Sequence, residues 1–290
     1  MPELPEVETV LRSIRPEVRG RLIRQVEILT SGVWLGSCND LCGFRIDDLR
    51  RRGKYLLFML SRGDETATLI VHLRMTGRLL MQQGDLPLQK HTHIRMLLSD
   101  TAASAQDAPL WLVFVDPRRF GRLWLLNGDH PELPHGLATL GPEPLENGFD
   151  KDLLAKRLSA RKTSLKALLL DQKVIAGLGN IYADESLFAS ALHPARRAHT
   201  LSAPETGRLA AAIRDVLERA IACNGTTLRD YADGWNRRGK FQDCLMVYGR
   251  AGEPCRVCGT TIRRMRLAGR STCWCPSCQP ENPDTEATHE

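Results

Sequence analysis

Residues 255–278 read CRVCGTTIRRMRLAGRSTCWCPSC, and this stretch decides how the C-terminal part of the chain folds. It is framed by two Cys-x2-Cys pairs, Cys255 with Cys258 and Cys275 with Cys278, and 16 residues lie between the pairs. Four thiolates at that spacing can close a tetrahedron, the geometry that Zn²⁺ prefers. The segment is too small to bury a core, so we expect one structural zinc ion to stabilise it.

Two other interpretations of these cysteines stay open at this point, namely two disulfides or an iron site of the rubredoxin kind. The chain has nine cysteines, and an odd number argues against a simple disulfide framework. The acidic start, residues 1–6, lacks the apolar core of a signal peptide. We therefore expect a cytoplasmic protein with reduced thiols, which favours zinc. Cys273 is an extra thiol, because its spacing from Cys275 does not fit a ligand pair.

The segment between the cysteine pairs is strongly basic. Residues 262–272 can form a hairpin, and residues 255–279 contain no Asp or Glu and five arginines: Arg256, Arg263, Arg264, Arg266 and Arg270. A basic hairpin held by a metal suits contact with phosphate, although a solvated basic loop has the same composition. The whole chain carries a net charge of +6, which is compatible with nucleic-acid binding.

In the part of the chain before this module, the sequence pattern predicts mainly strands first and mainly helices afterwards. Apolar residues at helical spacing predict a helix over 5–19, and six strands are expected over 22–29, 54–60, 68–73, 93–98, 110–115 and 122–126. Six short strands with turns between them indicate a sandwich or a barrel. Pro and Gly cluster at 131–148, which predicts a linker, and a capping box at Ser202–Glu205 starts a long helix. Loops are expected over 99–109 and 224–250.

Eight stretches, taken in order, resemble the formamidopyrimidine-DNA glycosylase family. They are residues 2–10 (PELPEVETV), 52–56 (RGKYL), 72–77 (HLRMTG), 116–121 (DPRRFG), 140–145 (LGPEPL), 177–182 (GLGNIY), 247–250 (VYGR) and the cysteine module. The resemblance covers residues 2–279, and the ordered set is far more specific than any one motif.

The resemblance implies an α+β fold: an N-terminal β-sandwich domain with an N-terminal helix, a helical domain with a helix-two-turn-helix motif, and a C-terminal zinc finger. The expected boundaries are 2–130 for the catalytic sandwich, 131–150 for the linker, 151–250 for the DNA-binding helical domain, 251–279 for the zinc finger and 280–290 for a disordered tail.

The activity that the resemblance implies is base excision repair of duplex DNA containing oxidised purines. The family removes the damaged base and then cleaves the strand through a Schiff base. Once Met1 is removed, Pro2 would supply a secondary amine as the nucleophile, and α-amino groups are partly unprotonated near neutral pH. Glu3 would act as general acid and base, and Lys54 would contact a phosphate. Arg270 is implied among the catalytic groups, at the flipped nucleotide's phosphate.

Further residues are implied to bind DNA. Met75, Arg118 and Phe120 would fill the space that the flipped base leaves. His93 and Asn180 would contact the DNA backbone, and Lys162 would approach the lesion. His91 and Arg161 remain alternatives for His93 and Lys162. Taken alone, Met75 or Phe120 is more often a core residue, and Asn180 can be a simple helix cap.

Two competing functions stay open: a non-catalytic zinc-dependent DNA-binding protein of this fold, and the pyrimidine-directed endonuclease VIII type. Intact Pro2, Glu3 and Lys54 argue against the first. Leu4 after the catalytic glutamate, with Arg118 and Phe120 present, argues against the second. No apolar run approaches the length of a membrane span, and we expect a monomer with no membrane partner.

Overall fold

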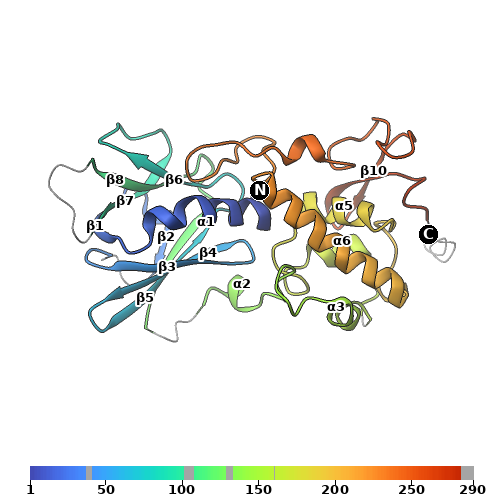
Figure 1. The fold of residues 1–290 in the computed structure, drawn as a ribbon, viewed down its shortest axis with the longest axis horizontal. Coiled ribbons are helices and arrows are strands. Elements are labelled where there is room, and N and C mark those ends of the chain that lie inside the picture. Colours follow the sequence, from blue (N-terminus) through green and yellow to red (C-terminus); the bar gives the residue numbers. More distant parts are fainter. Residues whose placement is uncertain (37–40, 101–107, 129–132, 160, 282–290) are drawn as a thin grey trace. The chain divides into compact units, whose positions relative to one another are not determined.

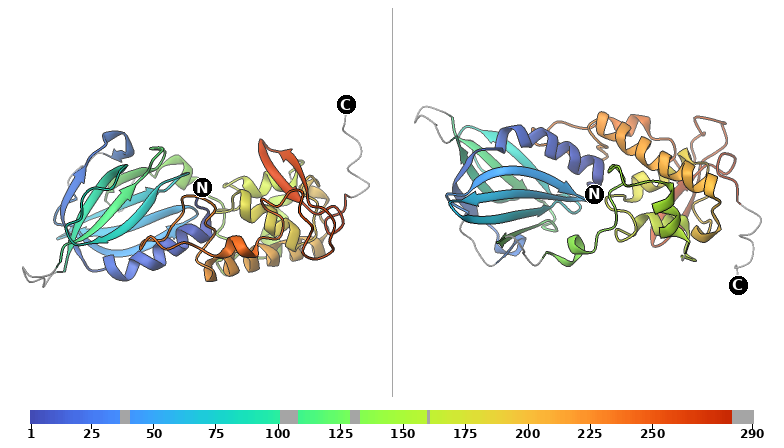
Figure 2. Two further views of the ribbon diagram at one scale, coloured as in Figure 1. Left: turned by 90° about the horizontal axis from the view of Figure 1, so that it is seen from above. Right: turned by 60° about the horizontal axis from the view of Figure 1, so that its bottom comes forward.

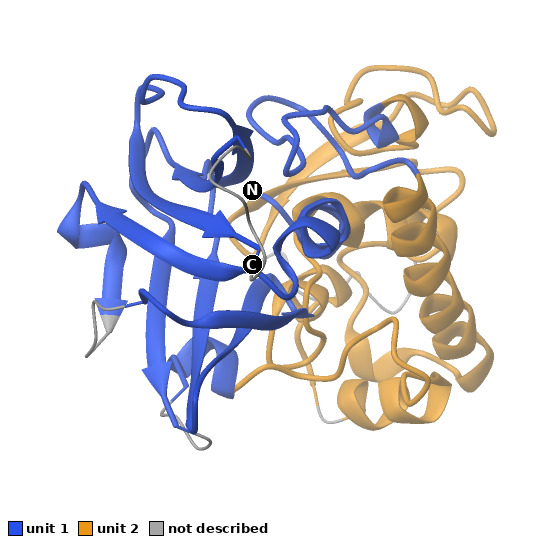
Figure 3. Ribbon diagram, turned by 60° about the vertical axis from the view of Figure 1, so that its left-hand side comes forward, with its two compact units in different colours: residues 1–138, 223–242 blue, residues 139–222, 243–290 orange. Residues whose placement is uncertain are grey.

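The computed structural model describes residues 1–36, 41–100, 108–128, 133–159 and 161–281. It consists of two compact units, residues 1–138 with 223–242 and residues 139–222 with 243–290 (Figure 3). The units do not follow the order of the chain, because residues 223–242 return to the first unit. Most of the loop expected at 99–109 and of the tail expected at 280–290 lies outside the described residues, and the expected domain boundaries stay a prediction.

The first unit begins with α1, Leu4–Val18, within one residue of the helix expected at 5–19. Its buried side includes Val7, Val10, Ile14 and Val18, at the spacing that places them on one face. Gly20, with φ of 83°, follows the end of the helix. Figure 2 shows α1 alongside the strands of the first unit, where it contacts β3, β4 and β6.

Nine strands form the sheet of this unit (Figure 1): β1 (Leu22–Ile28), β2 (Trp34–Gly36), β3 (Arg45–Arg52), β4 (Tyr55–Arg62), β5 (Glu65–His72), β6 (Arg78–Gln83), β7 (Thr92–Ser99), β8 (Leu110–Val115) and β9 (Arg122–Asn127). Their order is β2-β9-β5-β4-β3-β1-β7-β8-β6. One register pair, Leu22 with Arg45, joins β1 to β3, so the sheet divides there into two layers. Side chains from both layers and from α1 share one core, which confirms the expected sandwich.

All six expected strands are present, and β2, β3 and β6 were not expected. The sequence of β3, RIDDLRRR, is mostly charged, and a register shift between Ile46 and Asp48 interrupts its alternation. Ile46 and Leu49 are its buried apolar side chains. A helix α2 (His135–Ala138) and a 3-10 turn at Ser31–Val33 complete the unit up to residue 138.

The second unit contains the helices α3 (Lys151–Leu158), α4 (Leu165–Leu170), α5 (Asn180–Ala189) and α6 (Ala203–Ala222), and the hairpin β10 (Arg263–Leu267) with β11 (Arg270–Trp274). A short 3-10 turn lies at Ala198–Thr200, and another at Phe241–Cys244 begins in the last residues of the first unit and ends in the second. At the start of α6, Glu205 accepts a hydrogen bond from the backbone N–H of Ser202, as the capping box predicts, and it also pairs with Arg196. The hairpin expected at 262–272 is confirmed as β10–β11. No helix among the described residues is long and apolar enough to cross a membrane.

Candidate nucleic-acid interface and metal centre

The predicted nucleophile and acid lie at the start of α1. Pro2 is buried, and Glu3, 2% exposed, occupies the N-cap position. The backbone N–H of Glu3 donates to Glu6 Oε2 at 2.8 Å, and the other oxygen of Glu6 accepts from the N–H of Thr226 at 2.7 Å. Glu6 thus fixes Glu3 to residues 223–242 of the same unit, which gives it a positioning role.

Lys54 lies in the two-residue turn between β3 and β4, where Arg52 pairs with Tyr55 and Gly53 has φ of 55°. Such a turn needs positive φ, which glycine supplies without strain. The Tyr55 ring packs edge-on against the ring of His72, with centroids 4.4 Å apart. Burial of His72, with Arg74 and Lys54 nearby, lowers its pKa to about 3. The ring is therefore neutral at pH 7 and adds no positive charge beside Lys54.

Met75 is carried by a tight turn after β5. The N–H of Gly77 donates to the carbonyl of Leu73 at 3.0 Å, and a Cβ on Gly77 would lie 2.4 Å from that oxygen, so only glycine fits. The His72 ring supports the turn, because its Nδ1 accepts from the N–H of Arg74. Met75 is 39% exposed, which excludes a core role.

Arg118 and Phe120 lie on a second turn, between β8 and β9. The guanidinium of Arg118 stacks on the Phe120 ring at 4.6 Å, and Phe120 is 45% exposed. Asp116, which is fully buried, accepts from the N–H groups of Arg118 at 3.1 Å and Gly121 at 2.7 Å. An apolar ring with a cation over it is suited to stacking against nucleic-acid bases.

His93, expected to bind DNA with His91 as the alternative, is 2% exposed and is hydrogen-bonded through both ring nitrogens. Its Nδ1 bonds to the Thr30 hydroxyl at 2.9 Å and its Nε2 to the carbonyl of Asp116 at 2.8 Å. These bonds leave His93 no ring nitrogen for a phosphate. His91 is half-buried and is therefore the histidine that we propose for this contact. Arg161 and Lys162 are both exposed, so their surroundings do not choose between them.

In the second unit, Asn180 is the first residue of α5, after Gly179. Its Nδ2 donates to the carbonyl of Ser271 in β11 at 2.9 Å, and its Oδ1 is buried without a hydrogen-bond partner among the described residues. Asn180 therefore ties the start of α5 to the strand that begins at Arg270, and Arg270 is exposed.

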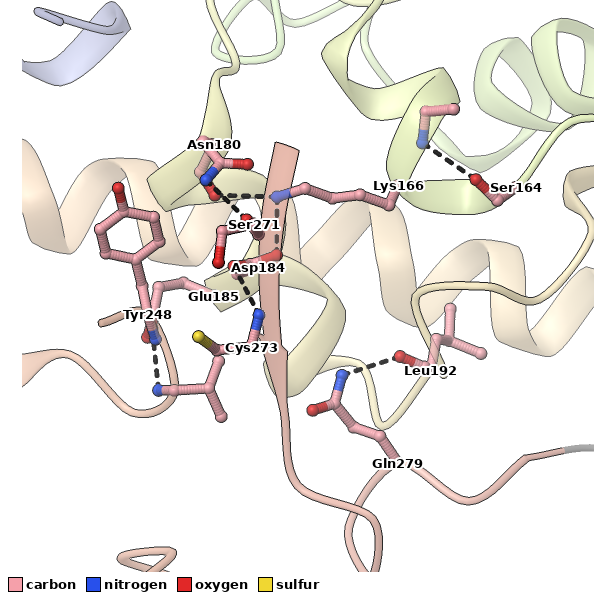
Figure 4. Close-up of polar contacts among 12 residues, drawn as sticks. Ser164, Lys166, Asn180, Asp184, Glu185, Leu192, Tyr248, Ser271, Cys273 and Gln279 are labelled. Atoms are coloured by element: carbon pink, nitrogen blue, oxygen red, sulfur yellow. Dashed lines mark hydrogen bonds and ion pairs between the residues drawn. The ribbon is translucent and has the colours of Figure 1, made fainter. Parts of the chain in front are cut away.

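A buried ion pair lies beneath this contact (Figure 4). Lys166 and Asp184 are both fully buried; Lys166 Nζ donates to Asp184 Oδ1 at 2.6 Å and to the carbonyl of Asn180 at 2.9 Å. The second oxygen of Asp184 accepts from the N–H of Cys273 at 3.1 Å. The pair therefore links α4, α5 and β11, and with them Asn180 and the hairpin.

Glu185, the next residue of α5, holds the turn at residues 246–248. Its carboxylate accepts from the backbone N–H groups of Met246, Val247 and Tyr248 at 2.8, 3.0 and 2.8 Å. Burial raises the pKa of Glu185, and the three N–H donors oppose that rise. Glu185 thereby fixes the backbone at Tyr248, within the VYGR stretch at residues 247–250.

The four expected metal ligands come together as predicted. The sulfur atoms of Cys255, Cys258, Cys275 and Cys278 all lie within 4.8 Å of one another, with Cys258 to Cys275 at 3.4 Å and Cys255 to Cys278 at 3.9 Å. A disulfide would need about 2.05 Å. Four thiolates about 2.3 Å from a zinc ion stand about 3.8 Å apart, so the residues fit zinc. Cys273 is buried outside the cluster, and its backbone N–H bonds to Asp184.

Removal of the zinc ion is expected to weaken DNA binding by the second unit while leaving the β-sandwich of the first unit folded. Cys258→Ala should lose the metal and lower DNA affinity about tenfold or more, because the hairpin with Arg270 loses its fixed position. The exposed Cys244→Ala is the matched control. Metal analysis and DNA titration check this, with circular dichroism to confirm that the β-sandwich persists. Full metal content in Cys258→Ala would contradict the ligand assignment.

The fold and the site define a protein with a β-sandwich and an N-terminal helix, joined in one chain to a helical unit with a four-cysteine zinc site. Comparison with known proteins identifies the family. Residues 1–123 match the formamidopyrimidine-DNA glycosylase N-terminal domain. Residues 140–232 match the formamidopyrimidine-DNA glycosylase H2TH domain, and residues 252–280 match a zinc finger found in FPG and IleRS.

Whole-chain relatives agree. The chain is 47% identical to formamidopyrimidine-DNA glycosylase of Symbiobacterium thermophilum, over 97% of this chain and 90% of that protein, and 45% identical to the Desulfitobacterium hafniense protein, over 96% and 100%. A solved complex of a Lactococcus lactis variant with Fapy-dG-containing DNA has a TM-score of 0.85 at 36% identity, covering 97% of this chain and all of that one. The Thermus thermophilus structure has a TM-score of 0.82 at 42% identity, with the same coverage. The chain belongs to the formamidopyrimidine-DNA glycosylase family.

Sequence reasoning missed the buried acids that position these side chains. Asp116, Asp184 and Glu185 were given no role, although Asp184 and Glu185 interrupt an otherwise apolar helix. That interruption is the signal that could have found them, since a buried carboxylate needs partners. Asp116 begins the DPRRFG stretch at residues 116–121, but no spacing rule indicates which backbone and side-chain groups its carboxylate accepts from.

Proposed function

We propose that this protein is a bifunctional DNA glycosylase and AP lyase that excises oxidised purines, formamidopyrimidines and 8-oxoguanine, from duplex DNA. The observation that carries the proposal is the start of α1, where Glu6 holds Glu3 beside Pro2 in the unit that exposes Met75 and Phe120. Membership of the family, at 47% identity to a named glycosylase, supports the same reaction.

The chemistry follows from a secondary amine. A base stacked in the duplex must first be flipped out. The Pro2 nitrogen then attacks the anomeric carbon, the damaged base leaves, and Glu3 moves the protons at the sugar. The C1′–O4′ bond then breaks, O4′ takes a proton from Glu3 as the sugar ring opens, and the product is an iminium ion, an electron sink. Loss of a proton from the adjacent carbon expels the 3′ phosphate, and a second elimination expels the 5′ phosphate. Lys54 and Arg270 hold phosphates, and zinc is structural.

We also propose a division along the sequence: residues 2–130 form the catalytic domain, 131–150 a linker, 151–250 the DNA-binding helical domain and 251–279 the zinc finger, with 280–290 as a tail. Within 151–250, residues 223–242 pack in the first compact unit. In this proposal Asn180 and His91 contact the DNA backbone, and one of Arg161 and Lys162 approaches the lesion. The protein acts as a monomer in the cytoplasm, where it meets chromosomal DNA.

A nicking assay on defined duplexes tests the activity and its substrate. The solved relatives from Lactococcus lactis are complexes with DNA containing Fapy-dG, an abasic site or an oxidised pyrimidine. We expect cleavage of Fapy-dG and 8-oxoguanine duplexes and of abasic DNA, slower cleavage at an oxidised pyrimidine and none of undamaged DNA. Binding without nicking would favour a non-catalytic protein, and faster cleavage at the pyrimidine would reverse the substrate assignment.

The proposed wedge makes a separate prediction. Met75→Ala or Phe120→Ala should slow removal of a paired lesion about tenfold, yet leave cleavage of a ready-made abasic site nearly unchanged, since no base needs extrusion there. Leu88→Ala, at another exposed apolar residue of the same unit, is the matched control. Single-turnover rates on both substrates check it. Equal losses on both would indicate ordinary structural damage.

A further inference from the structure

The two turns that carry the proposed wedge are joined by one buried carboxylate. Asp116 follows β8 directly and has no exposed surface. Its Oδ1 accepts a hydrogen bond from the hydroxyl of Thr76 at 2.5 Å. Thr76 belongs to the turn that carries Met75. The same carboxylate accepts from the N–H groups of Arg118 and Gly121, in the turn that carries Phe120. Donors from both turns therefore converge on a single side chain.

Close contacts and sheet pairing constrain each of the two turns separately. Close approach to the Leu73 carbonyl permits only glycine at position 77, and a Cβ at Gly121 would lie 2.5 Å from the Phe114 ring. The bases of the turns are held by sheet pairs, Arg78 with Val115 and His72 with Arg122. The side-chain bond from Thr76 to Asp116 ties their middle parts together, next to Met75 and two residues before Arg118.

The backbone of Asp116 also contacts the segment that contains His91 and His93. Its N–H donates to the carbonyl of His91 at 3.0 Å, and its carbonyl bonds to the ring of His93 at 2.8 Å. Burying a carboxylate is costly unless donors satisfy it, so a purely structural core would favour an apolar residue here. The donors that satisfy Asp116 come from the turns that carry exposed Met75, Arg118 and Phe120.

We propose that Asp116 and Thr76 are positioning residues that lock the Met75 turn to the Arg118–Phe120 turn, so that the three side chains enter the DNA as one rigid wedge. This inference rests on the proposed function. Without the lock, Met75 and Phe120 move independently, and ordering them during base extrusion costs free energy at that step alone. Glu3 is held by Glu6 and is not affected.

The test compares two substitutions of one hydroxyl. Thr76→Val keeps the shape and removes the donor, whereas Thr76→Ser keeps the donor and loses a methyl group. We expect Thr76→Val to slow lesion removal about tenfold, as for loss of a buried hydrogen bond to a charged group. It should cleave an abasic site at the unaltered rate, and Thr76→Ser should restore lesion removal. A 2-aminopurine probe beside the lesion should report slower base extrusion in Thr76→Val.

Other outcomes separate this inference from the proposed function. If Thr76→Val lowers both activities equally, or neither, the lock is wrong while the glycosylase assignment stands. If Thr76→Ser fails as Thr76→Val does, packing of the methyl group is responsible and the lock is again wrong. Asp116→Asn guards against a folding artefact in the valine variant. It keeps Oδ1 as the acceptor for Thr76 and for the N–H of Arg118, but it places an NH2 donor where Oδ2 accepts from the N–H of Gly121. The hold on the Phe120 turn is therefore weakened but not lost, and we expect an intermediate extrusion rate with an unchanged abasic rate. The proposed function is tested separately on the unaltered protein, and it fails if that protein does not cleave the lesion-containing duplex.

Discussion

Joining any residue to the nitrogen of Pro2 should reduce cleavage of lesion-containing and abasic DNA by about 10³-fold or more. The nitrogen then belongs to a tertiary amide, which cannot attack the sugar, and loss of a nucleophile costs several orders of magnitude in rate. A form with Met1 retained is the smallest such change. DNA binding should survive, because phosphate contacts dominate the affinity. Single-turnover cleavage and borohydride trapping of the covalent adduct measure the effect.

The controls for this prediction separate the amine from the fold. Pro2→Gly keeps a primary amine once Met1 is removed and should retain part of the trapping. Glu3→Gln should lower base release sharply and spare part of the cleavage at an abasic site, where no base departs. If the blocked form still gives an adduct, or the adduct maps to Lys54, then Pro2 is not the nucleophile and a lysine takes its place.

Local patterns in the sequence predicted the elements that carry strong periodicity or fixed spacing. Helix α1 follows from apolar residues on one face, and the zinc site follows from the two cysteine pairs, because ligands close in sequence must be close in space. Strand β3 escaped prediction because its residues are mostly charged and a register shift breaks their alternation. Its place in the sheet is decided by pairing with β4, which is not a local property.

For the candidate site too, local patterns predicted some residues, whereas others depended on contacts with distant parts of the chain. Pro2, Glu3 and Lys54 are recognisable from motifs, and so are Met75 and Phe120, although their exposure required the structure. The choice between His91 and His93 depended on partners far along the chain, Thr30 and the carbonyl of Asp116. No pattern within residues 90–93 distinguishes the two rings. Residues 223–242 likewise join the first unit through contacts that no linear boundary could indicate.

Replacing Lys166 with methionine should destabilise the second unit by about 3–5 kcal/mol, the usual cost of leaving a buried charge without its partner. Lys166 and Asp184 are both fully buried, so water cannot replace the lost ammonium. The same substitution also removes the hydrogen bond to the carbonyl of Asn180, at the start of α5. We therefore expect weaker DNA binding together with the lower stability. Urea unfolding, followed by a probe in the second unit, measures the change.

The pH dependence identifies Asp184 as the cause. Burial raises the pKa of Asp184 to about 6, against the opposing effect of Lys166. Without Lys166 that pKa should rise further. A carboxyl whose pKa is higher in the folded state favours folding when protonated, and this contribution is lost as the pH rises through the folded-state pKa. The deficit of Lys166→Met against the unaltered protein should therefore be smallest below about pH 4 and grow through pH 6 and above.

A double substitution completes the test. Lys166→Met with Asp184→Leu removes both charges, and apolar replacements of buried pairs are often close to neutral. It should recover most of the stability that Lys166→Met loses, and its stability should lose the added dependence on pH. DNA affinity should stay low, because the N–H of Cys273 then has no carboxylate to hold β11 and Arg270 in place. A deficit in Lys166→Met that does not change with pH, or a double variant no more stable than the single one, would show that packing rather than the unpaired charge causes the loss.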